Sequence, residues 1–359
     1  MKPESPFSKL PSLSELIQHP TVQSVVERVN QTTIAQRATG FLEELQASWK
    51  EPGHLPSVGE LAERLAHRLL GRADHCSPTV NATGVVCSQS WQAPLSDASV
   101  KELQRYASDF QQNRDASIQR VTSTLAKLAG AEAAWVASNF SAAMCLTEQC
   151  PEATLASSPL MGLLNPVHYG YEHVETIGDR IQAGDDLVVV DGSGLLGGPR
   201  CGIIFGKRSL IDQVQQSELQ SALAADAMTL STLESTLAVY RTPEQILHQI
   251  PLWQLLSAPL QNLQQRCHRI APLLADGESI ATAEPIELES AWLDDGESQL
   301  SSKSWAIAVQ PTDGNVQQLA KQFENAAPQI IPQVTEGKLQ LNFRSIFPRW
   351  DQHLISAIE

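Results

Sequence analysis

The chain lacks several features that mark special classes of protein. No apolar run approaches the roughly 18 residues needed to span a bilayer. The opening stretch, MKPESPFSKLPSL, lacks the apolar core of a signal peptide. Basic residues are also scarce, 25 Lys and Arg against 40 Asp and Glu, and the resulting net charge of −15 disfavours a general electrostatic grip on nucleic acid or anionic membrane. We therefore expect a soluble, cytoplasmic protein with no membrane partner.

Paired cysteines are missing as well. The six cysteines are scattered along the chain and none forms a CxxC pair, which indicates reduced core thiols and not a disulfide framework. Cys76 follows His75, and Cys267 precedes His268. Side chains of adjacent residues point in different directions, so neither pair makes a good chelate. The sequence therefore predicts no metal site.

The composition itself is that of a globular protein. The chain has 359 residues, of which 42% are hydrophobic and 18% are charged, and its length favours about two domains. Residues 1–75 have a helical pattern and are nearly neutral, with eight basic and nine acidic residues, so the remainder carries almost all of the negative charge. This asymmetry predicts a separate small helical domain. From about residue 80 the pattern alternates between strands and helices.

A small polar turn joins a predicted strand at 133–137 to a predicted helix at 142–149. The turn contains Ser138, Asn139, Phe140 and Ser141. A strand that leads into a helix through small polar residues is where α/β folds bind phosphate. An ordinary βα turn has the same composition, so both interpretations stay open.

The most informative stretch is 187–206. It holds Gly192, Gly194 and Gly197 at the spacing of the dinucleotide fingerprint, directly after an apolar run. That fingerprint needs a helix to begin within the glycines. Here Pro199 and a second apolar run at 202–205 follow at once. The pattern therefore predicts a tight turn at Gly194, with 187–190 pairing antiparallel to 202–205, and no nicotinamide or Walker-type site.

The C-terminal half alternates between long helical stretches and short strands. The predicted helices are 219–240, 242–256 with continuation to 275, 315–326 and 351–358, and the predicted strands are 305–309, 329–334 and 338–343. Trp253, Leu255 and Leu256 form an apolar cluster that belongs either to the core or to an interface between subunits.

Six segments, in order, resemble the bacterial selenocysteine synthases, the L-seryl-tRNA(Sec) selenium transferases. Residues 81–86 read Asn-Ala-Thr-Gly-Val-Val, and 191–202 read Asp-Gly-Ser-Gly-Leu-Leu-Gly-Gly-Pro-Arg-Cys-Gly. The matching segments are 11–20, 81–86, 93–96, 129–134, 191–202 and 228–237.

This resemblance implies an α/β fold of the fold-type-I pyridoxal-phosphate class. It implies a helical N-terminal domain at 1–75, a shortened large α/β domain at 76–257 and a small α/β C-terminal domain at 258–359. It also implies a set of cofactor-binding positions. These are Ser138, Asn139, Ser141, Gly192, Gly197 and Gly198.

The chain departs from the family where the chemistry resides. The lysine that would form the Schiff base with pyridoxal phosphate falls on Gly194. The family's acidic residue falls within 155–159, which contains no acid, and the family's long central stretch is absent between 149 and 155. Two basic positions fall on Ala224 and Ala227. A polar family stretch is replaced by Cys-Ser-Gln-Ser-Trp at 87–91.

Other residues offer poor substitutes. Lys207 is distant in sequence, and the guanidinium of Arg200 is always protonated and cannot form a Schiff base. Asp191 and Ser193 share the glycine turn, but a nucleophilic triad also needs a placed histidine. His168 and His173 are near only in sequence, so we predict no triad and no catalytic residue.

The leading hypothesis is a degenerate homologue without a bound cofactor, acting in assembly or regulation as a homo-oligomer. The alternatives are an active pyridoxal-phosphate transferase with unusual cofactor anchoring, and an unrelated nucleotide binder that uses the glycine turn. The resemblance implies tRNA as a partner, against which the net charge of −15 argues. We expect a shrunken or closed pocket filled by Phe140 and Trp91.

Overall fold

The structure is a computed structural model. It describes residues 12–26, 38–41, 58–69, 79–108, 114–172, 174–294, 296, 299–326, 328–335 and 337–358. The chain forms two compact units, Met1–Thr79 and Val80–Glu359. None of the helices in these ranges is both long and apolar enough to cross a membrane.

The first unit is helical in its described part. Its elements are α1 (Leu13–Gln18), α2 (Pro20–Val26) and α4 (Val58–Leu69). Ser12 and Glu15 start α1 with a reciprocal capping box, which satisfies backbone N–H groups that the first turn leaves free. Leu16, Val22 and Leu65 are buried, so the apolar stripes of the three helices form a small core.

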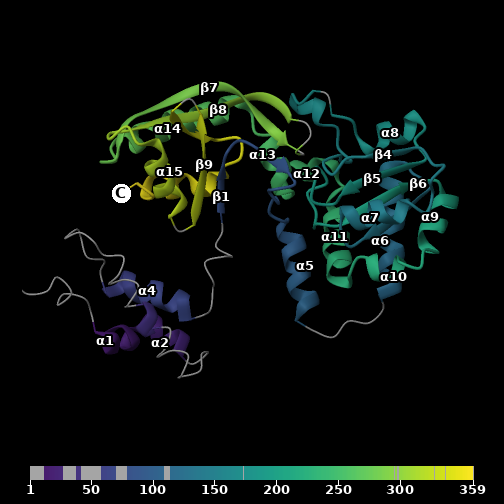
Figure 1. Cartoon of the computed structure of the whole chain (residues 1–359), viewed down its shortest axis with the longest axis horizontal. Coiled ribbons are helices and arrows are strands. Elements are labelled where there is room, and N and C mark those ends of the chain that lie inside the picture. Colours follow the sequence, from purple (N-terminus) through teal and green to yellow (C-terminus); the bar gives the residue numbers. More distant parts are fainter. Residues whose placement is uncertain are drawn as a thin grey trace, which may run out of the picture. The chain divides into compact units, whose positions relative to one another are not determined.

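A four-stranded sheet organises the first part of the second unit (Figure 1). It consists of β3 (Ala133–Ala137), β4 (Leu155–Ser157), β5 (Leu187–Asp191) and β6 (Gly202–Gly206), in the order β3-β6-β5-β4. The predicted antiparallel pairing is confirmed, with Val188 opposite Phe205 and Val190 opposite Ile203. A short connection, residues 148–154, joins α7 (Phe140–Thr147) to β4.

Helices cover both faces of this sheet. Successive β5 side chains point to opposite faces. Val188 and Val190 pack with α6 (Arg114–Ala129) and α11 (Ala227–Val239) in one cluster, and Leu187 and Val189 pack with α7 and α9 (Arg208–Gln215) in another. The remaining helical segments of this part are α5 (Asp97–Ala107), η3 (Pro166–Tyr169), α8 (Ile177–Ala183), α10 (Gln220–Leu223), α12 (Pro243–Gln249) and α13 (Pro251–Leu256).

A six-stranded sheet organises the second part, with helices α14 (Leu260–Ala275) and α15 (Val316–Glu324) against it (Figure 1). Its order is β1-β9-β10-β8-β7-β2. The strands are β1 (Thr79–Ala82), β2 (Cys87–Ser88), β7 (Ile280–Asp294), β8 (Gln299–Pro311), β9 (Gln329–Thr335) and β10 (Lys338–Asn342). The segments η4 (Pro348–Trp350) and α16 (Asp351–Ser356) end the described chain.

Three expectations need correction. The predicted helix 219–240 is broken at Ala224, which is extended and bridges to Ala137 of β3 before α11 begins. The predicted helix 242–256 is broken at Ile250, because a residue that precedes proline is disfavoured in the α conformation. The strand expected at 305–309 is the end of a much longer hairpin, β7–β8, whose first strand was not predicted. The cluster of Trp253, Leu255 and Leu256 is buried and belongs to the core.

Candidate functional site

The β5–β6 connection is a glycine turn, as predicted. The side chain of Asp191, at the end of β5, accepts hydrogen bonds from the Ser193 backbone N–H at 2.8 Å and from the Ser193 hydroxyl at 2.7 Å. The Gly194 N–H donates to the Asp191 carbonyl at 3.1 Å, and the Gly198 N–H donates to the Gly192 carbonyl at 2.8 Å. No helix begins at Gly194. The turn therefore lacks the helix N-terminus that a dinucleotide fingerprint requires.

Gly194 is packed against backbone. A Cβ atom built there would lie closer than 3.0 Å to the Pro159 carbonyl oxygen and 3.0 Å from the Leu160 Cα. Both atoms belong to the chain that follows β4, so neither can rotate away as a side chain does. A side chain at Gly194, where the resemblance implies the family's lysine, would therefore clash with this backbone unless the backbone shifted.

The other glycines of the turn are also close-packed. A Cβ at Gly192 would lie 2.6 Å from the Cys201 sulfur, and one at Gly198 would lie 3.0 Å from a Leu196 methyl carbon. Gly197 has a positive φ of 67°, a conformation that favours glycine. These three predicted cofactor positions therefore have a packing reason to be glycine.

The polar turn after β3 is built around Asn139. Its side-chain oxygen accepts a hydrogen bond from the Ala142 N–H at 2.8 Å and so caps α7. The Ser138 N–H donates to the Leu223 carbonyl at 2.7 Å. Ala224, where the resemblance implies a basic residue, follows Leu223, and its methyl group supplies no charge to this turn.

A cavity of about 180 Å³ lies where the two turns meet. Its lining residues are Ser88, Gln89, Asn139, Phe140, Ser141, Pro159, Leu160, Asp191, Ser193 and Arg200. Of the predicted cofactor positions only Asn139 and Ser141 line it. Phe140 lines it as expected, but Trp91 does not. Small-molecule sites occupy about 300–1,000 Å³, so this cavity is small.

The cavity carries one charge of each sign, from Asp191 and Arg200. Arg200 donates a hydrogen bond to the Gln89 carbonyl at 2.9 Å. Ser88 and Gln89 were not predicted from the sequence to line this cavity. The one available indication was their place in the stretch 87–91, which stands where the resemblance implies a polar segment. Two buried thiols lie near the carboxylate: burial, and then the Asp191 charge, raise the pKa of Cys87 to about 12 and also raise the pKa of Cys201.

Lys207 is too far away to take the place of a lysine at Gly194. It follows β6, and it forms an ion pair with Asp186, which precedes β5. Because β5 and β6 are antiparallel, Gly194 and Lys207 lie at opposite ends of the sheet, separated by about 17 Å for a five-residue strand. The ion pair holds the pKa of Asp186 down at about 2 and raises the pKa of Lys207.

No nucleophilic triad or metal cluster is assembled by the described residues. The Ser193 hydroxyl donates a hydrogen bond to the Asp191 carboxylate, and His168 is exposed on η3. His173 and the His75–Cys76 pair lie outside the described residues. Within the described ranges no group of three His, Cys, Asp or Glu side chains is placed to hold a metal ion.

The Asn-Ala-Thr-Gly-Val-Val segment has a structural role. The Gly84 N–H donates to the Ser345 hydroxyl at 2.9 Å, and that hydroxyl donates to the Asn81 carbonyl at 2.8 Å. Gly84 has a φ of 91°, and a Cβ there would lie 2.7 Å from the side-chain carbon Cγ of Asn342. This segment therefore anchors the start of the second unit to the turn that follows β10.

The chain is similar in sequence to known selenium transferases. A family model described as "SelA: L-seryl-tRNA selenium transferase" matches residues 153–347, more than half of the chain. The L-seryl-tRNA(Sec) selenium transferase of Yersinia enterocolitica (serotype O:8 / biotype 1B) is 35% identical over 190 residues, which cover 51% of this chain and 41% of that relative. The Yersinia pestis (strain Pestoides F) protein of the same name is 33% identical over 208 residues, covering 56% and 44%. The match thus spans less than half the length of these relatives.

Among solved structures, a D-glucosaminate-6-phosphate ammonia-lyase is similar with a TM-score of 0.51 and 13% identity, covering 85% of this chain and 97% of that one. At this identity the likeness concerns the fold alone. It agrees with the predicted α/β architecture of the fold-type-I pyridoxal-phosphate class.

Proposed function

Because the chain belongs to the L-seryl-tRNA selenium transferase family, we propose that it keeps the family's fold without the covalent pyridoxal-phosphate chemistry, and that it acts in assembly or regulation. One observation carries the proposal. The resemblance implies the family's lysine at Gly194, and the Pro159–Leu160 backbone lies in the space that a side chain would need there.

The residues around the cavity do not fit a covalently held pyridoxal phosphate. The covalent anchor needs an unprotonated lysine amine next to the cofactor aldehyde. Of the described residues that line the cavity none is a lysine, and Arg200 is its one basic group. An arginine stays protonated and cannot take the place of the amine.

The acidic and basic residues that the resemblance implies around the cofactor are also absent from their expected positions. The stretch 155–159, within which the resemblance would place a carboxylate, contains no acid. Ala224 and Ala227 stand where the resemblance would place two basic residues. Loss of a single group can be repaired by a neighbour. Simultaneous loss of the anchor, the acid and the basic groups supports a chain that no longer performs the reaction.

For assembly we propose a homo-oligomer, because fold-type-I enzymes commonly build their sites between subunits. Trp253 and its neighbours are core residues and supply no interface. Static light scattering at micromolar concentration measures the mass directly. A dimer or larger species is the expected result, and a monomer of 39.1 kDa would contradict the assembly role.

The catalytic half of the proposal is tested by a selenium-transfer assay on seryl-tRNA with added pyridoxal phosphate. The Yersinia enterocolitica relative, assayed in parallel, is the positive control. We expect product from the relative and none from this chain. Product from this chain, together with visible absorbance after cofactor addition, would favour the alternative of an active transferase with unusual anchoring.

A further inference from the structure

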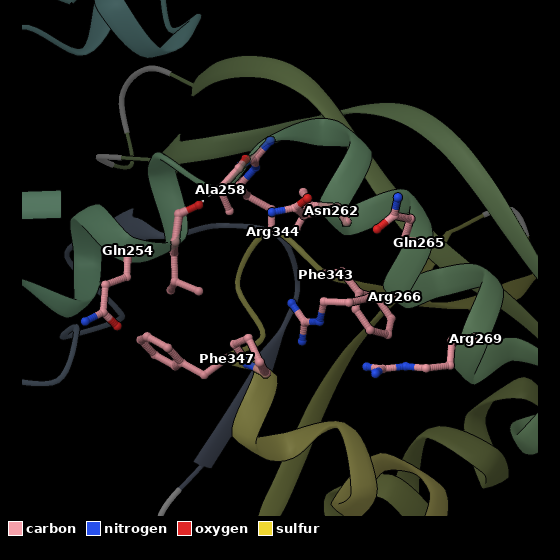
Figure 2. A pocket seen from close by; sticks show the side chains of 12 residues that line it. Gln254, Ala258, Asn262, Gln265, Arg266, Arg269, Phe343, Arg344 and Phe347 are labelled. Atoms are coloured by element: carbon pink, nitrogen blue, oxygen red, sulfur yellow. Dashed lines mark hydrogen bonds between the residues drawn. The ribbon is translucent and has the colours of Figure 1, made fainter. Parts of the chain in front are cut away.

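A second and larger cavity lies elsewhere in the unit Val80–Glu359. It has a volume of about 530 Å³, within the range of small-molecule sites, and it lies between α13, α14 and the segment that follows β10 (Figure 2). It shares no lining residue with the cavity at the glycine turn. Its lining residues are Gln254, Leu255, Ala258, Asn262, Leu263, Gln265, Arg266, Arg269, Phe343, Arg344, Phe347 and Pro348.

Positive charge is in excess at this cavity. Arg266 and Arg269 lie one helical turn apart on α14, and both form ion pairs with one carboxylate, that of Asp351, at 2.6 Å. Two guanidinium groups therefore share a single negative charge. The Arg269 side chain is 65% exposed, and within the described ranges Asp351 is its only ion-pair partner. Most of its N–H donors are thus free to bind a ligand.

Arg344 adds a third guanidinium group, which is buried at 4% exposure. It donates to the Leu255 and Ala258 carbonyls, at 3.2 and 2.8 Å, but its buried Nε–H has no hydrogen-bond acceptor among the described residues. Dipoles of carbonyl groups do not neutralise a full charge, so Arg344 adds to the positive potential of the cavity. Such a concentration of positive charge stands out in a chain with a net charge of −15.

Apolar surface completes the site. The Arg266 guanidinium lies 4.9 Å from the centroid of the Phe343 ring. Figure 2 shows Arg266 and Arg269 extending from α14, with the Phe347 side chain across the cavity from them. Leu255 and Ala258 extend the apolar lining. A ligand here would contact guanidinium groups on one side and an aromatic ring on the other.

We propose that this cavity binds a small organic phosphate, with the phosphate on Arg266 and Arg269 and an apolar portion against Phe347. A guanidinium group can donate two parallel hydrogen bonds to two oxygens of one phosphate. A surplus of guanidinium groups over carboxylates also favours a dianion over a monoanion. The proposal is independent of the absence of covalent cofactor chemistry, because no residue is shared between the two cavities.

Titration calorimetry on the full chain tests it with phenyl phosphate as the probe. Inorganic phosphate lacks the apolar portion, phenol lacks the charge, and benzoate carries a single charge on a carboxylate. We expect saturable binding that is tightest for phenyl phosphate. If inorganic phosphate or benzoate bound as tightly as phenyl phosphate, the proposed ligand class would be contradicted. If none of the anionic probes bound, the proposal of an anion site in this cavity would be overturned.

Two variants locate the binding. Arg269→Gln is expected to weaken phenyl phosphate binding about tenfold, the loss of a charge-assisted contact. The matched control is Arg120→Gln, which removes an arginine of similar exposure, 57%, that pairs with Glu234 outside the cavity. The control should bind as the unaltered chain does. An equal effect of both substitutions would refute the assignment.

Asp351→Asn gives a prediction of opposite sign. Removing the shared carboxylate frees Arg269 and leaves Arg266 bonded, among the described residues, only to the Ile346 carbonyl, at 3.0 Å, so phenyl phosphate should bind more tightly, provided that circular dichroism shows a folded protein. If this variant unfolds, the comparison of Arg269→Gln with Arg120→Gln still decides the question. Weaker binding by folded Asp351→Asn would contradict the proposed roles of the arginines.

Discussion

Gly194→Ala is the substitution that probes the closed lysine position most sharply. The added Cβ would lie closer than 3.0 Å to the Pro159 carbonyl oxygen and 3.0 Å from the Leu160 Cα. Overpacking of this kind costs about 1–3 kcal/mol, and backbone neighbours leave little room to relax. The alanine also reduces the entropy of the unfolded chain, which offsets about 0.4–1 kcal/mol. We expect a net loss of about 2 kcal/mol in the free energy of unfolding.

The matched control for that substitution is Gly178→Ala in α8. A Cβ there meets its nearest atoms at 3.7 Å, an ordinary contact distance, and alanine favours the helix by up to about 1 kcal/mol. Urea unfolding followed by tryptophan fluorescence measures both variants, because Trp253 and Trp292 are buried in this unit. We expect the control to be as stable as the unaltered chain or slightly more so. A Gly194→Ala protein as stable as the control would refute the closed position.

Three further predictions concern other parts of the second unit. Gly84→Ala should lower the free energy of unfolding by about 2 kcal/mol, since it combines a positive φ with a clash against Asn342, and urea unfolding measures it. The ion pair with Lys207 lowers the pKa of Asp186 to about 2. The ionised carboxylate therefore stabilises the folded chain above the unfolded-state pKa of about 3.9, and this stabilisation is lost as the pH falls towards 2. In acid unfolding curves, Asp186→Asn should flatten the loss of stability over this pH range. Cys145 is half-buried while the other described cysteines are buried, so iodoacetamide with peptide mapping should label it first, and equal labelling rates would contradict the structure.

The β5–β6 turn of the four-stranded sheet was predictable from sequence. Two apolar runs flank a glycine-rich segment with Pro199, and this local pattern fixes both the turn and the antiparallel pairing. The hairpin β7–β8 was not predicted, because most β7 residues between Ile280 and Trp292 are exposed or half-buried and form no apolar run. The alternation of Ile286 and Leu288 with glutamates was the available signal.

The candidate cavities were harder to predict, for a physical reason. Arg266 lies on α14, and Phe347 follows β10, far along the chain, so only the tertiary fold brings them to one cavity. The resemblance already implied, from sequence alone, a glycine at 194 in place of the family's lysine. The closure of that position by the Pro159–Leu160 backbone was not visible in the sequence, because it depends on how the chain leaves β4.

Intact-mass spectrometry after borohydride reduction tests the central claim most directly. The full chain is mixed with pyridoxal phosphate, reduced, and weighed, and the Yersinia enterocolitica relative is treated in the same way. Reduction makes any imine between a lysine and the cofactor permanent. The account predicts a stoichiometric mass increase for the relative and the unmodified mass of this chain. A stoichiometric adduct on any lysine of this chain, Lys207 included, would contradict it.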